Sequence, residues 1–202
     1  MRETVLFWRR TLKRLDLSAR TLAAVIEPGS CFAGTLAELA FAADRSFMLD
    51  GTLAAGPPNP AVLVVTDANL GWYTMANGLS RLATRFFGHA ELLDAAAGNL
   101  GKELLAVDAS ALGLVTSTPD ELDWDDEVRL FLEERASFSP DALTGMEANF
   151  RFVGPETMET KIFGRLSAWQ NWIFQRPNAA GPEGALRRYG TGSRPVYDRK
   201  RA

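Results

Sequence analysis

Hydrophobic positions follow two different periods along the first part of the chain. Apolar runs short enough for buried strands occur at 21–26, 46–49 and 61–66. Between and beyond them, apolar residues at helical spacing predict helices over 3–16, 34–43, 74–86 and 90–97. Buried strands joined by helices predict an α/β fold with a small, mostly parallel sheet.

Beyond residue 119 the pattern is helical. The acidic stretch 120–127 is interpreted as a solvated N-terminal cap for an apolar helix over 128–132, in preference to a metal site, and Ser139-Pro140 predicts a further helix start. A long helix over 156–175 carries a broad apolar and aromatic stripe, which we expect to pack on a core or on a neighbouring subunit. We therefore expect three parts: a core over 1–118, a helical region over 119–178 and an irregular, basic tail over 179–202.

The most informative segment lies between the first two apolar runs. Val25-Ile26 leads through a glycine-containing loop into an Ala/Leu-rich helix that begins near Gly34. The first N–H groups of a helix lack intrahelical partners, so an anionic oxygen beside Gly34 and Thr35 would be stabilised. Glu38 follows about one turn later and can face the same spot. An oxyanion site beside a carboxylate suits acid–base chemistry on a carbonyl compound.

This segment resembles the crotonase (enoyl-CoA hydratase/isomerase) superfamily. There, a similar strand, loop and helix end in Gly-Gly-Gly-Cys-Glu-Leu-Ala, followed by three residues and Asp; Glu38-Leu39-Ala40 and Asp44 match in type and spacing. Thr35 and Leu36 replace the last two glycines, which still leaves a backbone N–H at Thr35. The resemblance implies a crotonase-like (ClpP/crotonase) α/β spiral fold followed by C-terminal helices.

Longer runs resemble one branch of that superfamily. Residues 26–34, 157–166 and 169–178 are similar to the benzoyl-CoA-dihydrodiol lyases, also called 2,3-epoxybenzoyl-CoA dihydrolases. The resemblance covers nearly the whole chain but only the C-terminal part of those enzymes, so we expect an incomplete spiral. Their upstream region includes earlier strands and the loop with the other oxyanion N–H. We therefore expect the isolated chain to be far less active than its full-length relatives.

The resemblance implies an enzyme that acts on a CoA thioester. Its reaction would open the ring of 2,3-epoxybenzoyl-CoA hydrolytically, giving 3,4-didehydroadipyl-CoA semialdehyde and formate in aerobic benzoate degradation. It would need no cofactor, because coenzyme A is part of the substrate. Two alternatives remain open: a generic crotonase-type enoyl-CoA hydratase or isomerase, and a catalytically incomplete fragment that serves only binding or assembly.

Two carboxylates are the candidate acid–base residues. The resemblance places Glu38 at the position of a catalytic acid or base, with a helix-surface carboxylate as the alternative. Aligning Gly71 with the glycine after the second catalytic glutamate of hydratases places Asp67 at that glutamate's position, with an Asx cap as the alternative. Two such carboxylates over one carbonyl would divide the roles of acid and base between them.

Other candidate residues would bind the substrate. The Gly34 and Thr35 N–H groups would hold the thioester oxygen, and Ser30 and Tyr73 could bind substrate oxygens, although loop capping and core packing explain these two as well. Lys161 and Arg165 lie four residues apart and share one helix face, so they are candidates for coenzyme A phosphates; a solvated face is the alternative.

The amino-acid composition argues against several other classes of protein. The chain has 202 residues, 47% of them hydrophobic, and a net charge of −3, which suits a soluble domain with a core. We expect no nucleic-acid partner and no membrane span, because neither a basic, aromatic-rich cluster nor a long apolar run is present. One cysteine, Cys31, and one histidine, His89, argue against a disulfide, a metal cluster and a Cys/His nucleophile. We expect a cytoplasmic homodimer whose ligand is an acyl-CoA.

Overall fold

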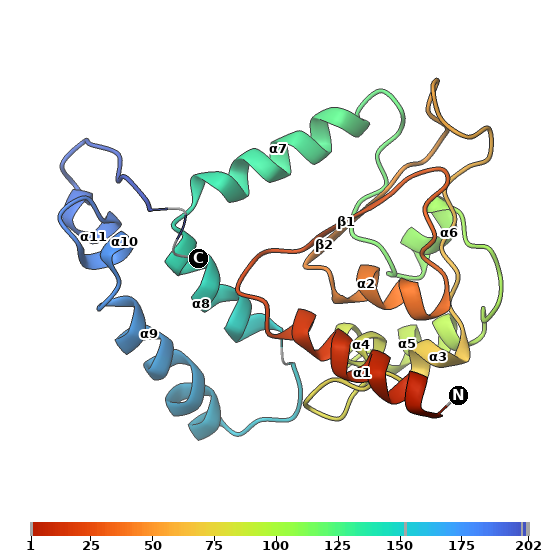
Figure 1. Ribbon diagram of the computed structural model, residues 1–202, viewed down its shortest axis with the longest axis horizontal. Coiled ribbons are helices and arrows are strands. Elements are labelled where there is room, and N and C mark those ends of the chain that lie inside the picture. Colours follow the sequence, from red (N-terminus) through yellow and green to blue (C-terminus); the bar gives the residue numbers. More distant parts are fainter. Residues whose placement is uncertain (1, 152, 199, 201–202) are drawn as a thin grey trace. The chain divides into compact units, whose positions relative to one another are not determined.

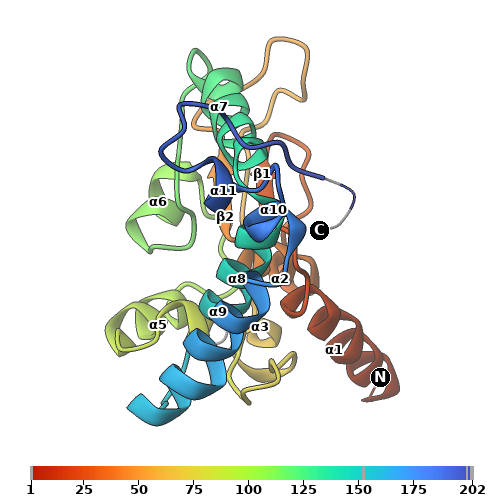
Figure 2. The ribbon, with the colours of Figure 1, turned by 90° about the vertical axis from the view of Figure 1, so that its left-hand side faces the viewer.

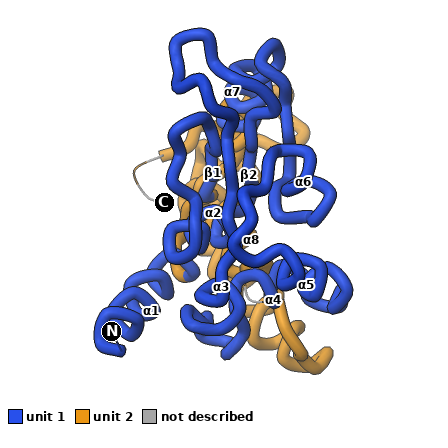
Figure 3. The backbone as a smooth tube through the Cα atoms, turned by 90° about the vertical axis from the view of Figure 1, so that its right-hand side faces the viewer, with its two compact units in different colours: residues 1–16, 22–132 blue, residues 17–21, 133–202 orange. Residues whose placement is uncertain are grey.

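The computed structural model describes residues 2–151, 153–198 and 200. The chain forms two compact units, shown in different colours in Figure 3. The first unit contains residues 1–16 and 22–132, and the second contains residues 17–21 and 133–202.

A parallel pair of strands lies at the centre of the first unit (Figure 1). Strands β1 (Ala23–Ile26) and β2 (Arg45–Met48) pair in parallel, with Ala23 opposite Arg45 and Ile26 opposite Met48. The crossover between them contains a 3₁₀ turn, η1 (Gly34–Leu36), and the short helix α2 (Ala37–Ala42). The predicted strands over 21–26 and 46–49 are confirmed as a parallel pair, and helical structure begins at Gly34 as predicted, with a 3₁₀ turn that precedes the α-helix.

The remaining elements of the first unit are helices. They are α1 (Arg2–Asp16), α3 (Asp67–Gly71), α4 (Arg81–Arg85), α5 (Ala90–Ala97), α6 (Ala106–Ala111) and α7 (Trp124–Ser137), of which residues up to Leu132 belong to this unit. Helices α1 and α5 confirm two predictions from hydrophobic spacing. The prediction of one helix over 74–86 is wrong, because Gly78, with φ +83°, lies in a turn that Met75 and Leu79 close before α4 begins.

The apolar run 61–66 is buried but does not form the predicted strand. Leu63 forms an antiparallel bridge with Leu104, and Val64 forms a parallel bridge with Ala33, but both bridges are isolated. A regular strand needs a neighbour that runs beside it for several residues. The run still serves the core, because Leu63 and Val65 pack with residues of β1, β2 and α4 in one hydrophobic cluster.

The second unit is helical. Its elements are α8 (Pro140–Phe150), a π-helical stretch η2 (Thr160–Leu166), α9 (Ser167–Ile173), α10 (Pro177–Ala180) and α11 (Ala185–Arg188) (Figure 2). Ser139 caps α8 by accepting a hydrogen bond from the Ala142 N–H, as the sequence predicts. The segment 179–202, which we expected to be irregular, contains the end of α10 and the one-turn helix α11.

Candidate active site

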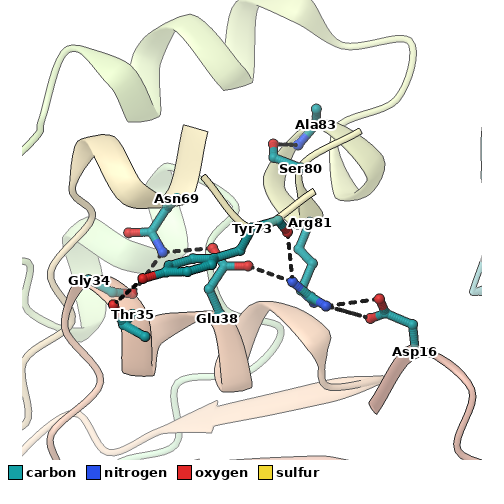
Figure 4. A network of polar contacts seen from close by, with 9 residues as sticks. All are labelled: Asp16, Gly34, Thr35, Glu38, Asn69, Tyr73, Ser80, Arg81 and Ala83. Atoms are coloured by element: carbon teal, nitrogen blue, oxygen red, sulfur yellow. Dashed lines mark hydrogen bonds and ion pairs between the residues drawn. The ribbon is translucent and has the colours of Figure 1, made fainter. Parts of the chain in front are cut away.

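The best sequence candidate, Glu38, lies in the first turn of α2 and is buried, with 1% of its surface exposed. Helix α2 packs against η1, α1 and α4, and the Glu38 carboxylate lies in the interior of the first unit among these elements (Figure 4). A carboxylate in such a place needs hydrogen-bond partners, since burying an unpaired charge is costly. Both of its oxygens have them.

Asn69 supplies the first partner. Its side-chain amide donates to Glu38 Oε1 at 2.8 Å and to the Gly34 carbonyl oxygen at 2.8 Å, while its own Oδ1 accepts from the Thr66 N–H at 2.9 Å. Asn69 therefore ties the start of α3 to the loop before α2 and to the carboxylate. The Thr66-to-Asn69 spacing of a capping box was the sequence signal that could have located α3.

Arg81 supplies the second partner, at the start of α4. Its Nη1 donates to Glu38 Oε2 at 2.8 Å, and its Nε and Nη2 bind both oxygens of Asp16 at 2.8 to 3.1 Å. Ser80 fixes this end of α4 by accepting from the Ala83 N–H. Sequence reasoning missed Arg81 and Asp16 as site residues, because they lie 43 and 22 positions from Glu38 and belong to no local motif.

The loop before α2 offers one candidate oxyanion donor. The Gly34 N–H is engaged, since it donates to the Val64 carbonyl oxygen at 3.1 Å. The Thr35 N–H has no backbone acceptor among the described residues. Gly34 has φ +51°, and a Cβ there would lie 3.2 Å from Thr66 Oγ1, so the loop requires glycine at this position. The Thr35 side chain fits in this loop, and its hydroxyl oxygen lies 2.8 Å from the hydroxyl oxygen of the buried Tyr73.

The structure gives the other predicted site residues different surroundings. Asp67 is exposed at the first position of α3, so the α3 side chain that reaches Glu38 is that of Asn69. The Ser30 hydroxyl accepts from the Glu27 N–H at 2.9 Å, which is a loop-capping contact. In the second unit Lys161 is exposed, whereas Arg165 forms an ion pair with Glu156 at 2.9 Å.

Burial raises the pKa of Glu38 above its ordinary value, and the nearby charge of Asp16 raises it further. The hydrogen bonds from Asn69 and Arg81, and the positive charge of Arg81, act in the opposite direction but do not cancel the effect of burial. A carboxyl group with a raised pKa can hold a proton and release it near the pH at which an enzyme works. The raised pKa of Glu38 therefore suits this carboxyl group to proton transfer.

The raised pKa predicts a pH dependence of stability. The folded protein binds the Glu38 proton more tightly than the unfolded chain, so this contribution is fully present below the ordinary pKa of 4.5 and is lost as the pH rises through the folded value. We expect the free energy of unfolding of the wild type to fall relative to that of Glu38→Gln over this window, as measured by urea titration at a series of pH values. A constant difference between the two proteins across the series would contradict the prediction.

No cluster of three or more His, Cys, Asp or Glu side chains placed for a metal ion occurs within residues 2–151, 153–198 and 200. Over the same part of the chain, every helix is too short or too polar to cross a membrane. The Cys31 side chain is exposed in the loop before η1, and His89 lies 3.1 Å from Glu91 at the surface.

Comparison with known proteins confirms the resemblance. The chain is 54% identical over 198 residues to a protein of Aromatoleum evansii named benzoyl-CoA-dihydrodiol lyase. The match covers 98% of this chain and 35% of the relative, so the chain spans about a third of that protein's length. No protein-family model matches the chain.

Solved structures give the fold. The enoyl-CoA hydratase of Geobacillus kaustophilus HTA426 matches with a TM-score of 0.69 at 21% identity, over 97% of this chain and 68% of the other. The enoyl-CoA hydratase of Bacillus anthracis matches with a TM-score of 0.63 at 19% identity, over 97% and 69%. The chain therefore has an incomplete enoyl-CoA hydratase (crotonase) fold and is similar, over nearly its whole length, to part of a benzoyl-CoA-dihydrodiol lyase.

Proposed function

We propose that this chain carries part of the active site of a CoA-thioester lyase that opens the ring of 2,3-epoxybenzoyl-CoA hydrolytically and releases formate. The observation that carries the proposal is the 54% identity to the Aromatoleum evansii lyase, which extends over 198 residues, or 98% of this chain. The enoyl-CoA hydratase structures, at 14% to 21% identity, support the fold alone. They do not favour hydration or isomerisation over ring opening.

The site residues have distinct roles in this proposal. The Thr35 N–H binds the thioester oxygen and stabilises the enolate-like charge that forms during C–C cleavage. Glu38 moves the proton and positions water. Asp67, although exposed, remains the candidate for a second carboxylate. Of the two residues considered for coenzyme A phosphates, Lys161 is favoured, because the guanidinium of Arg165 is already paired.

Coenzyme A enters as part of the substrate, and the proposed reaction requires no resident cofactor. The single cysteine in the sequence and an acyl-CoA substrate support a cytoplasmic location.

The test is formate release. The purified protein is incubated with 2,3-epoxybenzoyl-CoA, and in parallel with crotonyl-CoA and a 3-enoyl-CoA, while formate, hydration and double-bond migration are followed. We expect formate from the first substrate only. Turnover of an enoyl-CoA without formate would replace the proposal by a generic hydratase or isomerase. Tight thioester binding with no turnover of any substrate would favour a fragment that only binds.

We also propose that the protein forms a homodimer through the apolar face of segment 158–174. Five large apolar side chains there are at least 38% exposed: Met158, Ile162, Phe163, Leu166 and Phe174. Soluble monomers rarely leave such a face in water. Trp169 and Trp172, which belong to the aromatic stripe predicted over 156–175, are half-buried and pack edge to face on each other. The segment carries Glu159, Lys161 and Arg165, so two copies would not repel strongly.

Phe163→Glu is expected to weaken this dimer at least tenfold. Withdrawing one buried phenylalanine costs about 1.5–3 kcal/mol, and about 1.4 kcal/mol corresponds to a factor of ten. Sedimentation equilibrium over a range of concentrations measures the effect. Val107→Glu, which places the same charge at an exposed apolar position on α6, is the matched control. A wild type that remains monomeric at every concentration would rule the dimer out.

A further inference from the structure

Arg81 is buried so completely that it can act only through other residues of the protein. Its exposed fraction is 2%, and each of its three guanidinium nitrogens donates to a protein acceptor. Besides its bonds to Asp16 and Glu38, its Nη1 donates to the Tyr73 carbonyl oxygen at 3.1 Å (Figure 4). A guanidinium engaged in this way is a fixed part of the site and does not itself meet a substrate.

Two carboxylates share this one positive charge. Asp16 pairs with two nitrogens of the guanidinium. Arg81 Nε lies 3.1 Å from Asp16 Oδ1, and Nη2 lies 3.0 Å from Oδ1 and 2.8 Å from Oδ2. Glu38 receives a single bond, from Nη1 at 2.8 Å. Bidentate pairing is the stronger arrangement, so Asp16 competes effectively with Glu38 for the charge. Among the described residues, the second oxygen of Glu38 accepts a hydrogen bond from the neutral amide of Asn69 alone.

We propose that Arg81 and Asp16 are positioning residues for Glu38: Arg81 fixes the carboxylate through one hydrogen bond, while Asp16 pairs with the other two guanidinium nitrogens and so holds Arg81 in place. The consequence for catalysis rests on the proposed function, in which Glu38 is the acid or base. The electrostatic coupling between Arg81, Asp16 and Glu38 does not depend on that function, because it follows from the folded structure. A site with one guanidinium and two buried carboxylates carries a net charge of −1 when all three are ionised, which favours a proton on the less well paired carboxylate, Glu38.

The charged side chains facing Glu38 come from two elements, Arg81 from α4 and Asp16 from α1. The other side chain that donates to it, the Asn69 amide from α3, carries no charge. Loss of each charge should therefore move the pKa of Glu38 in a known direction. Loss of Asp16's negative charge should lower it, and loss of Arg81's positive charge should raise it.

The experiment measures the Glu38 pKa directly, with no substrate. The full chain is labelled with [δ-¹³C]glutamate, the Glu38 resonance is identified by its disappearance in Glu38→Gln, and its shift is followed against pH. Asp16→Asn, which keeps the shape of the side chain, is expected to raise the acid dissociation constant of Glu38 by about tenfold or more. Arg81→Gln is expected to lower it by a similar factor. Arg81→Lys keeps the charge but not the fork and should restore most of the wild-type value.

Asp94→Asn is the matched control, because Asp94 is an exposed carboxylate on α5. It should leave the Glu38 midpoint unchanged. If Arg81→Gln does not fold, Asp16→Asn and Arg81→Lys still decide the question. An unchanged or higher Glu38 pKa in folded Asp16→Asn would overturn the proposal. Because no turnover is needed, a failed formate assay would remove the proposed function and leave this result standing.

Discussion

Glu38→Gln is expected to lower kcat for formate release by about 10²–10⁴-fold, the usual contribution of a positioned acid or base. Glutamine keeps the size of the side chain and one oxygen that accepts from either Asn69 or Arg81, while its NH₂ faces the other donor, so kcat is compared on variant protein whose circular dichroism matches that of the wild type. What it lacks is the transferable proton. Binding of a non-reactive thioester such as benzoyl-CoA should therefore change little, and the loss should appear in kcat and not in the binding constant.

Two companion variants sharpen this measurement. Asp67→Asn reports whether the exposed carboxylate of α3 takes part, and Asp94→Asn controls for the loss of one negative charge from the surface. Should Glu38→Gln retain a kcat within a few fold of the wild type, Glu38 would have no role in proton transfer. The buried network would then be purely structural.

The parts of the fold that sequence predicted correctly are those set by local signals. Helix α1 follows from an amphipathic repeat, α8 from the Ser139-Pro140 cap, and the loop before α2 from a glycine between an apolar run and a helix. Each signal lies within a few residues of the structure that it specifies. The same reasoning placed Glu38 correctly at the start of a helix, since its position depends on that local turn.

The error over 74–86 reflects a local turn at Gly78, whereas the other errors arise where distant residues decide the outcome. The apolar run 61–66 was predicted as a strand from its composition, but its pairing depends on Ala33 and Leu104. The partner of Glu38 was expected to be Asp67 by alignment, whereas the start of α3 turns Asn69 toward Glu38, 31 positions earlier in the chain. Asp16 and Arg81 lie 65 positions apart and meet only because α1 and α4 both pack beside α2. The hydrophobic periodicity of the sequence carries no information on such long-range contacts.

Removal of Arg81 should cause the largest loss of stability. In Arg81→Met, the Asp16 and Glu38 carboxylates, with side chains 3% and 1% exposed, would lose their shared cation. Breaking a buried ion pair by removing one partner costs about 3–5 kcal/mol, because a buried charge is left uncompensated. Since domains are stable by only about 5–15 kcal/mol, this is a large share of the total. Urea unfolding followed by circular dichroism at neutral pH measures it.

Arg129→Met is the matched control, since Arg129 pairs with Asp126 on the surface of α7, where the two side chains are 53% and 70% exposed. Water screens such a pair, and its loss should cost no more than about 1 kcal/mol. The cost of Arg81→Met should also fall as the pH is lowered, because a protonated Glu38 no longer needs the cation. Equal effects of the two substitutions would mean that the Asp16–Arg81–Glu38 network contributes no more to stability than an ordinary surface pair, and would remove the physical basis for assigning Arg81 a role in holding Glu38.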